Sequence, residues 1–139
     1  MSCDQNLILR TLDTIAVERD NFDHSFDLVQ QIVGEFGEDH LAERLYGLIP
    51  HERPWQDIAD MFGFLVWCTS DNGGELMETM DAWLQSADDE RKVLIALNID
   101  IYPFRDQAEM KRVLTSVALR WPNAAARCAE LIRTRGAES

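Results

Sequence analysis

Carboxylate and aromatic side chains are concentrated in one part of this sequence, residues 54–90. The segment holds nine Asp or Glu residues and no Lys or Arg, together with three of the four tryptophans. Carboxylates in such number could serve acid–base catalysis, bind a cation, or pair with a basic protein. The segment also contains the most apolar run of the chain, residues 61–68. It is therefore expected to organise the core, to form a binding surface, or to do both.

Two helices are predicted within this segment. In the second, residues 75–86, the acidic residues Glu75, Glu78 and Asp81 fall within an arc of about 120° at helical spacing, opposite the apolar side chains. Such an arc faces either water or a partner. A solvated acidic face is the simpler interpretation for a single helix.

The first of the two helices, residues 54–69, leaves two interpretations open. Phe64 and Trp67 project on the same side as Asp57 and Asp60. A second layer of helices could cover the two aromatic rings, which would make this the central helix, since helices apolar nearly all round are usually buried. Alternatively, the rings lie partly exposed between carboxylates, as a binding site for an Arg- or Lys-rich protein requires. On the second interpretation the partner-binding residues are Asp57, Asp60, Phe64, Trp67, Asp71, Glu75, Glu78 and Asp81.

No catalytic, metal or cofactor motif stands out in the sequence. His24, His40 and His51 do not lie a helical turn apart, and no Glu-x-x-His motif is present. Residues 71–75, DNGGE, resemble a calcium loop, but the glycine is third rather than sixth. Cys68 lies in the apolar run, where burial raises a thiol pKa and makes it inert. We therefore expect no catalytic residue, no bound metal, no cofactor and no enzymatic activity.

The charge distribution favours a basic protein as partner. The formal net charge is −12. Residues 1–90 carry 20 acidic and 4 basic side chains, whereas residues 91–139 carry 5 acidic and 9 basic ones. The acidic part repels nucleic acid and anionic membranes, and the basic side chains near the C-terminus are spread over two predicted helices rather than clustered. Neither nucleic acid nor membrane is therefore an expected partner.

Apolar residues recur at helical spacing along most of the chain, which predicts a single all-α domain over residues 1–139. We expect a compact irregular bundle built from antiparallel helical hairpins, with HEAT-like stacked hairpins as the alternative. The segment IDIYPF (99–104) is expected to be an extended connector. The N-terminus has no signal-peptide pattern and the three cysteines are expected to be reduced, so the protein is expected to be cytoplasmic. The predicted helices are 4–19, 24–36, 38–48, 54–69, 75–86, 89–98, one from Asp106 to about Trp121, and one ending near Arg135.

In size, helical pattern and the acidic, aromatic segment 54–90, the chain resembles the small acidic immunity proteins that protect bacteria from their own secreted toxins. This resemblance implies a cognate toxin domain, often an enzyme acting on nucleic acid or nucleotides, whose active site or substrate approach is blocked. A HEAT-like scaffold without inhibitory role is the alternative, followed by an enzyme or ligand sensor with a site between helices. The sequence gives no indication of oligomeric state.

Overall fold

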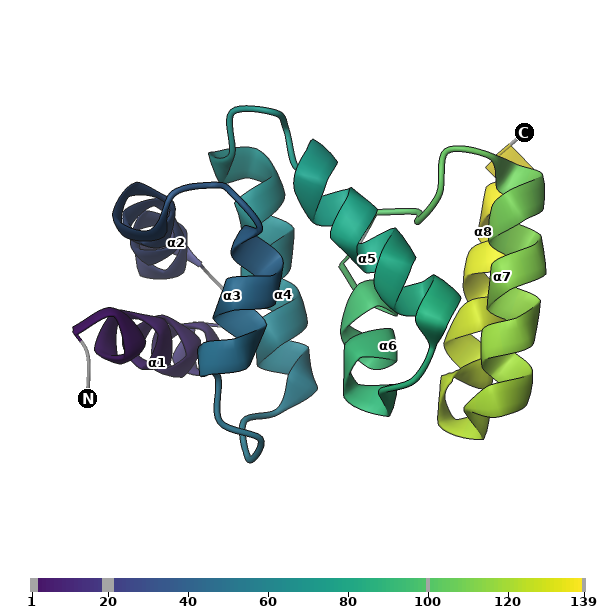
Figure 1. Cartoon of the computed structure of the whole chain (residues 1–139), viewed down its shortest axis with the longest axis horizontal. Coiled ribbons are helices and arrows are strands. Elements are labelled where there is room, and N and C mark those ends of the chain that lie inside the picture. The colour runs from purple at the N-terminus through teal and green to yellow at the C-terminus, as the bar shows by residue number, and fades with distance from the viewer. Residues whose placement is uncertain (1–2, 19–21, 100, 139) are drawn as a thin grey trace. The chain divides into compact units, whose positions relative to one another are not determined.

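The computed structural model of the chain describes residues 3–18, 22–99 and 101–138, and within these ranges it contains helices and no strand. The prediction of an all-α chain of about eight helices is confirmed (Figure 1). The helices in chain order are α1 (Cys3–Val17), α2 (Asp23–Phe36), α3 (Leu41–Leu48), α4 (Trp55–Cys68), α5 (Gly74–Ser86), α6 (Glu90–Leu97), α7 (Gln107–Arg120), the 3₁₀ helix η1 (Pro122–Ala124) and α8 (Ala125–Glu138).

Local capping explains three of the observed helix ends. The carboxylate of Asp89 accepts hydrogen bonds from the N–H groups of Arg91 and Lys92 at the start of α6, and Asp106 does the same for Glu109 in α7. At the end of α2, Gly37 takes a positive φ of 73° while its N–H donates to the carbonyl of Val33. The segment after Ile99 is non-helical, as expected, with residue 100 not described.

Three boundary predictions differ from the structure or fall outside it. Helix α3 begins at Leu41 rather than residue 38, because His40 takes a left-handed φ of 51° that ends any helix entering from its N-terminal side. Helix α8 continues through Gly136 to Glu138, so the stop predicted near Arg135 is wrong. The predicted end of the first helix at residue 19 lies outside the described residues.

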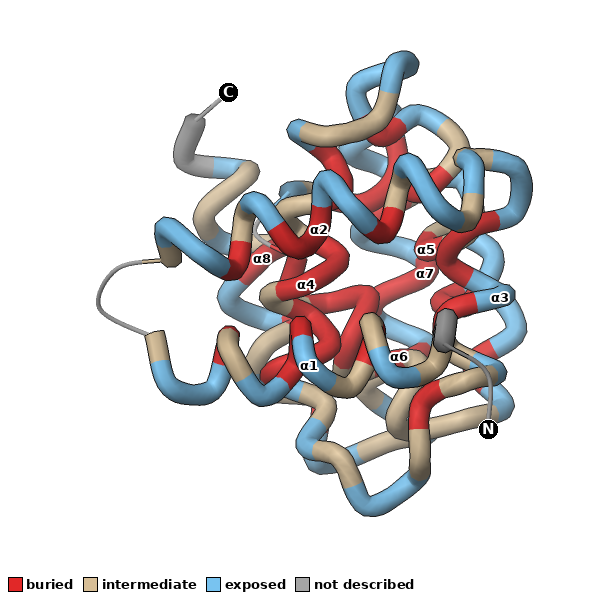
Figure 2. Tube along the Cα trace, turned by 90° about the vertical axis from the view of Figure 1, so that its left-hand side faces the viewer, coloured by how far each residue is buried: buried red, intermediate tan, exposed pale blue. Residues whose placement is uncertain are grey.

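The chain divides into two compact units, Met1–Thr79 and Met80–Ser139, here called unit 1 and unit 2. In unit 1, α1, α2 and α4 pack against one another and α3 packs on α1 (Figure 1). Helices α1 and α2 each bury one stripe of side chains, whereas α4 is buried along much of its length (Figure 2). The fully buried Ile8, Leu12, Ile32 and Phe62 belong to this core.

In unit 2, α7 and α8 lie side by side and run antiparallel, joined by η1 (Figure 1). Met110, Leu114 and Cys128 are buried between elements of this unit. The connector before α7 is anchored by Arg135, whose guanidinium donates to the carbonyl oxygens of Pro103, Phe104 and Arg105. These hydrogen bonds tie an otherwise irregular segment to the last helix.

The two units differ in charge. Unit 1 carries 16 acidic and 4 basic residues, whereas unit 2 carries nine of each. The whole formal net charge of −12 therefore belongs to unit 1. None of the described helices combines the length and apolar character that crossing a bilayer requires.

Candidate functional site

Helix α4 forms the centre of unit 1. It packs against both α1 and α2, and Ile58, Phe62 and Leu65 are almost completely buried. Asp57 is only 5% exposed. The expectation that Asp57 contributes to a surface binding site therefore disagrees with the structure, because this turn of α4 is covered on more than one side.

The two aromatic residues Phe64 and Trp67 have different surroundings. Phe64 is half-buried, and its ring makes edge contacts with Phe22 at 5.1 Å and Phe26 at 6.2 Å between centroids. Trp67, one turn later, is 77% exposed. Phe64 is thus part of the packing between α2 and α4, whereas the side chain of Trp67 is exposed.

The connector that follows Trp67 is bonded to the connector between α2 and α3. The backbone N–H and the hydroxyl of Ser70 both donate to Glu38 Oε1 at 2.9 Å. Glu75, in the first turn of α5, accepts a hydrogen bond from the backbone N–H of His40 at 2.5 Å. Two segments more than 30 residues apart in sequence thereby lie side by side.

Asp71 holds the second of these connectors in shape. Its carboxylate accepts the N–H of Gly73 at 3.1 Å and the N–H of Glu75 at 2.9 Å. The hydrogen bond from Glu75, assisted by those from Thr69 and Gly73, lowers the pKa of Asp71 below its ordinary value of 3.8. Gly73 takes a φ of 80°, and a Cβ there would lie 3.0 Å from a methyl group of Val66. The positive φ and this close approach both require glycine at position 73.

The paired connectors carry Glu38, Asp39 and Asp71, and the exposed Trp67 lies in the last turn of α4, three residues before Ser70. Arg44, the cation at the start of α3, donates to the carbonyl oxygens of Gly37 and Asp39. It thus binds the backbone of the connector. We call the surface the Trp67 surface and define it as Trp67, Glu38, Asp39, Asp71, Glu75 and Glu78.

The structure changes the membership of the predicted site. Asp60 is half-buried on the same stripe of α4 as Trp67, one heptad earlier, and Glu78 is exposed. Asp81 belongs to unit 2, where its carboxylate accepts the N–H of Phe104 at 3.0 Å. Glu38 and Asp39 were not predicted, because their proximity to residues 70–75 depends on two connectors pairing across the fold. The acidic run Glu38-Asp39, directly after the glycine at which α2 ends, is the signal that could have identified them.

Asp39, His40 and Glu75 form a group whose donor atoms lie within 4.8 Å of one another. One imidazole and two carboxylates are donors that a divalent transition metal accepts. Both Asp39 and His40 are exposed, however, and Glu75 already binds the N–H of His40. The arrangement is accounted for by the pairing of the two connectors.

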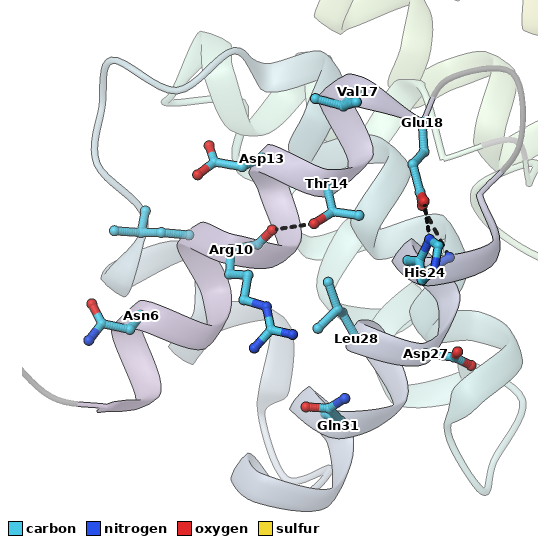
Figure 3. A pocket seen from close by; sticks show the side chains of 11 residues that line it. Asn6, Arg10, Asp13, Thr14, Val17, Glu18, His24, Asp27, Leu28 and Gln31 are labelled. Carbon is cyan, nitrogen blue, oxygen red and sulfur yellow. Dashed lines mark hydrogen bonds and ion pairs between the residues drawn. The ribbon is translucent and has the colours of Figure 1, made fainter.

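A wider cleft of about 780 Å³ lies between α1 and α2 within unit 1 (Figure 3). Arg10 reaches into it from α1, and Leu28 contributes an apolar part of its wall from α2. The lining also contains the carboxylates of Asp13 and Asp27. Its charges are therefore mixed, and they do not converge on one ligand group.

At one end of this cleft, Glu18 and His24 form an ion pair. Glu18 Oε2 lies 2.5 Å from His24 Nδ1, while Glu18 Oε1 accepts the N–H groups of His24 and Ser25 (Figure 3). Glu18 thereby caps the N-terminal end of α2, although it lies outside that helix. The hydrogen bond to His24 lowers the pKa of Glu18, and the same bond and charge raise the pKa of His24.

The described thiols are not activated nucleophiles. Cys128 is buried, and burial raises its pKa to about 11. Cys68 is half-buried, and burial raises its pKa as well. Both are unbridged. Each thiol is therefore protonated near neutral pH, in agreement with the expectation for Cys68.

Comparison with known proteins finds no matching family model, no matching curated protein and no matching solved structure.

Proposed function

We propose that this protein binds a basic protein partner through the Trp67 surface and neutralises it, as an immunity protein neutralises a cognate bacterial toxin. The observation that carries the proposal is the exposure of Trp67, at 77%, in the last turn of α4, directly before a connector that is hydrogen-bonded to Glu38. Leaving a tryptophan in water forgoes apolar burial, and tryptophan is among the residues that most often anchor protein interfaces.

Each component of the Trp67 surface has a distinct role in this proposal. The indole supplies a large, rigid contact area of the kind that dominates protein interfaces. The carboxylates of Asp39 and Glu78, both exposed, attract a cationic partner and select against anionic ones. Glu38 and Asp71 are already hydrogen-bonded to the connectors, so they present fixed charge with little further ordering on binding.

The charge difference between the units supports the same partner. All of the excess negative charge belongs to unit 1, which contains the Trp67 surface. Attraction between opposite charges raises association rates above the about 10⁵–10⁶ M⁻¹s⁻¹ typical of neutral pairs, and salt reduces the gain. A toxin enzyme that acts on nucleic acid has the basic surface such an inhibitor requires.

The test is capture of the partner by the immobilised full chain from a lysate of the source organism, at low and at high salt. The captured protein is identified by mass spectrometry, purified and tested for enzymatic activity with and without this chain. We expect a basic protein whose activity the chain suppresses, and whose capture is lost with Trp67→Ala and reduced with Asp39→Lys/Glu78→Lys.

The matched control is Asp27→Lys/Glu52→Lys, which makes the same change in net charge at two exposed acids of unit 1 that do not belong to the Trp67 surface. Glu52 precedes α4, at the opposite end of that helix from Trp67. Capture that survives Trp67→Ala, or that falls equally in both charge variants, would refute the assignment of the surface. A captured protein whose activity is unaffected would refute neutralisation while leaving binding in place.

A further inference from the structure

Unit 2 contains a groove whose charge is opposite to that of the chain as a whole. The groove has a volume of about 450 Å³ and lies between the C-terminal end of α5 and one face of α7. Arg112 and Arg120 line it from α7, and among the described residues its lining contains no Asp or Glu. The whole chain carries 25 acidic and 13 basic residues, so the charge of this lining has the opposite sign to the net charge of the chain.

The cationic side chains have a regular spacing. Arg112, Ser116 and Arg120 recur every fourth residue, so they share one face of α7, and the two arginines lie about 12 Å apart along its axis. Neither guanidinium is in an ion pair among the described residues. Arg120 instead lies over the ring of Trp121, at 5.6 Å from the centroid, which restricts its position.

An exposed leucine and an apolar floor accompany these charges. Leu119 is 83% exposed and falls on the same face of α7 as Arg112, seven residues away. Leu84 and Val113 contribute apolar surface to the groove itself. The two arginines therefore stand beside one exposed apolar side chain, Leu119, and above apolar side chains that form the floor of the groove.

The wall opposite α7 is held in place before any ligand arrives. Trp121 donates its indole N–H to the carbonyl oxygen of Ala87 at 2.7 Å, and Ala87 takes a positive φ of 47°. Ser86 also lines the groove, and its hydroxyl lies 3.4 Å from Asp88 Oδ1, which places one carboxylate at the rim. A preformed groove loses little conformational entropy on binding.

We propose that this groove, named the Arg112–Arg120 groove, is a docking site for an acidic amphipathic peptide segment of a second protein. Two carboxylates about two helical turns apart would pair with the arginines, and apolar residues between them would contact Leu119 and the floor. Helix-in-groove recognition of this kind uses anchors at helical spacing. The site goes beyond the binding of a basic partner, because it selects the opposite charge and lies in the other unit.

The test measures fluorescence anisotropy of a labelled, amphipathic helical peptide with two glutamates two turns apart and leucines between them, titrated with the full chain. We expect saturable binding that weakens with salt, and no binding of the same peptide with lysine at both glutamate positions. Arg112→Glu/Arg120→Glu should reduce the affinity about tenfold or more, since each exposed ion pair is replaced by repulsion. Leu119→Ser should also weaken binding, and Asp88→Asn should tighten it.

Lys111→Glu/Arg133→Glu is the matched control, because it makes the same charge change at exposed positions of unit 2 that do not line the groove. Circular dichroism of each variant establishes that it is folded. The proposal is overturned if the peptide does not bind saturably, if both double variants lose affinity equally, or if a single-stranded oligonucleotide or a second copy of this chain competes more strongly than the peptide.

Discussion

Removing the ring of Phe64 should destabilise the protein, whereas removing the ring of Trp67 should not. The two residues lie one turn apart on α4, but Phe64 contacts Phe22 and Phe26 while Trp67 is 77% exposed. Truncating a fully buried Phe to Ala costs about 3–5 kcal/mol, and edge-to-face ring pairs contribute about 0.5–1.5 kcal/mol each beyond their area. Because Phe64 is only half-buried, we expect Phe64→Ala to cost about 2–3 kcal/mol.

Phe64→Leu separates the ring contacts from apolar volume. Leucine retains most of the buried area but cannot present an aromatic edge, so we expect a loss of about 1–2 kcal/mol. Trp67→Ala is expected to change the free energy of unfolding by less than about 0.5 kcal/mol, as exposed substitutions usually do.

Urea unfolding followed by circular dichroism measures these differences, with an unchanged m-value as the check that the unfolded states are comparable. If Trp67→Ala costs as much as Phe64→Ala, the indole is packed in solution and the Trp67 surface as defined here does not exist. If Phe64→Ala costs nothing, the contacts between α2 and α4 do not contribute to the fold as described.

Two further predictions concern ionisable groups that fix helix ends. NMR titration should show a pKa for His24 above 6.5, because the hydrogen bond to Glu18 raises it, and this pKa should fall toward 6.5 in Glu18→Gln. The contribution of the pair to the free energy of unfolding should be lost as pH rises through the raised pKa of His24. It should also be lost as pH falls through the lowered pKa of Glu18. An unshifted His24 would show that Glu18 caps α2 without the imidazole. Asp71→Ala should lower the free energy of unfolding by about 1 kcal/mol, as loss of a capping carboxylate does. Urea unfolding at several pH values should show this loss shrinking as pH falls through the lowered pKa of Asp71. A loss that does not depend on pH would mean that the charge of Asp71 is irrelevant to the cap.

Sequence periodicity was sufficient to predict the helices but not to predict which residues form the candidate site. The caps at Asp89 and Asp106 act within three residues, so local chemistry identifies them. The end of α8 could not be predicted from Gly136, because a glycine that permits a helix end does not require one. Likewise Glu18 caps α2 by accepting the N–H of Ser25 from seven residues away, a contact that helical spacing does not predict.

The candidate site depends on contacts between distant segments. Helical spacing correctly grouped Asp57, Phe64 and Trp67 near one side of α4, but exposure is decided by neighbouring helices. Asp57 is buried and Phe64 is half-buried, whereas Trp67 is exposed. Glu38 joins the site through its hydrogen bonds to Ser70, a pairing for which no sequence pattern exists.

The most direct test of the Trp67 surface is the association rate of the purified basic partner with this chain as a function of salt. We predict a fast rate that falls with ionic strength, a markedly slower and less salt-dependent rate for Asp39→Lys/Glu78→Lys, and a faster dissociation for Trp67→Ala at nearly unchanged association rate. Association and dissociation rates in these variants equal to those of the Asp27→Lys/Glu52→Lys control would contradict the account.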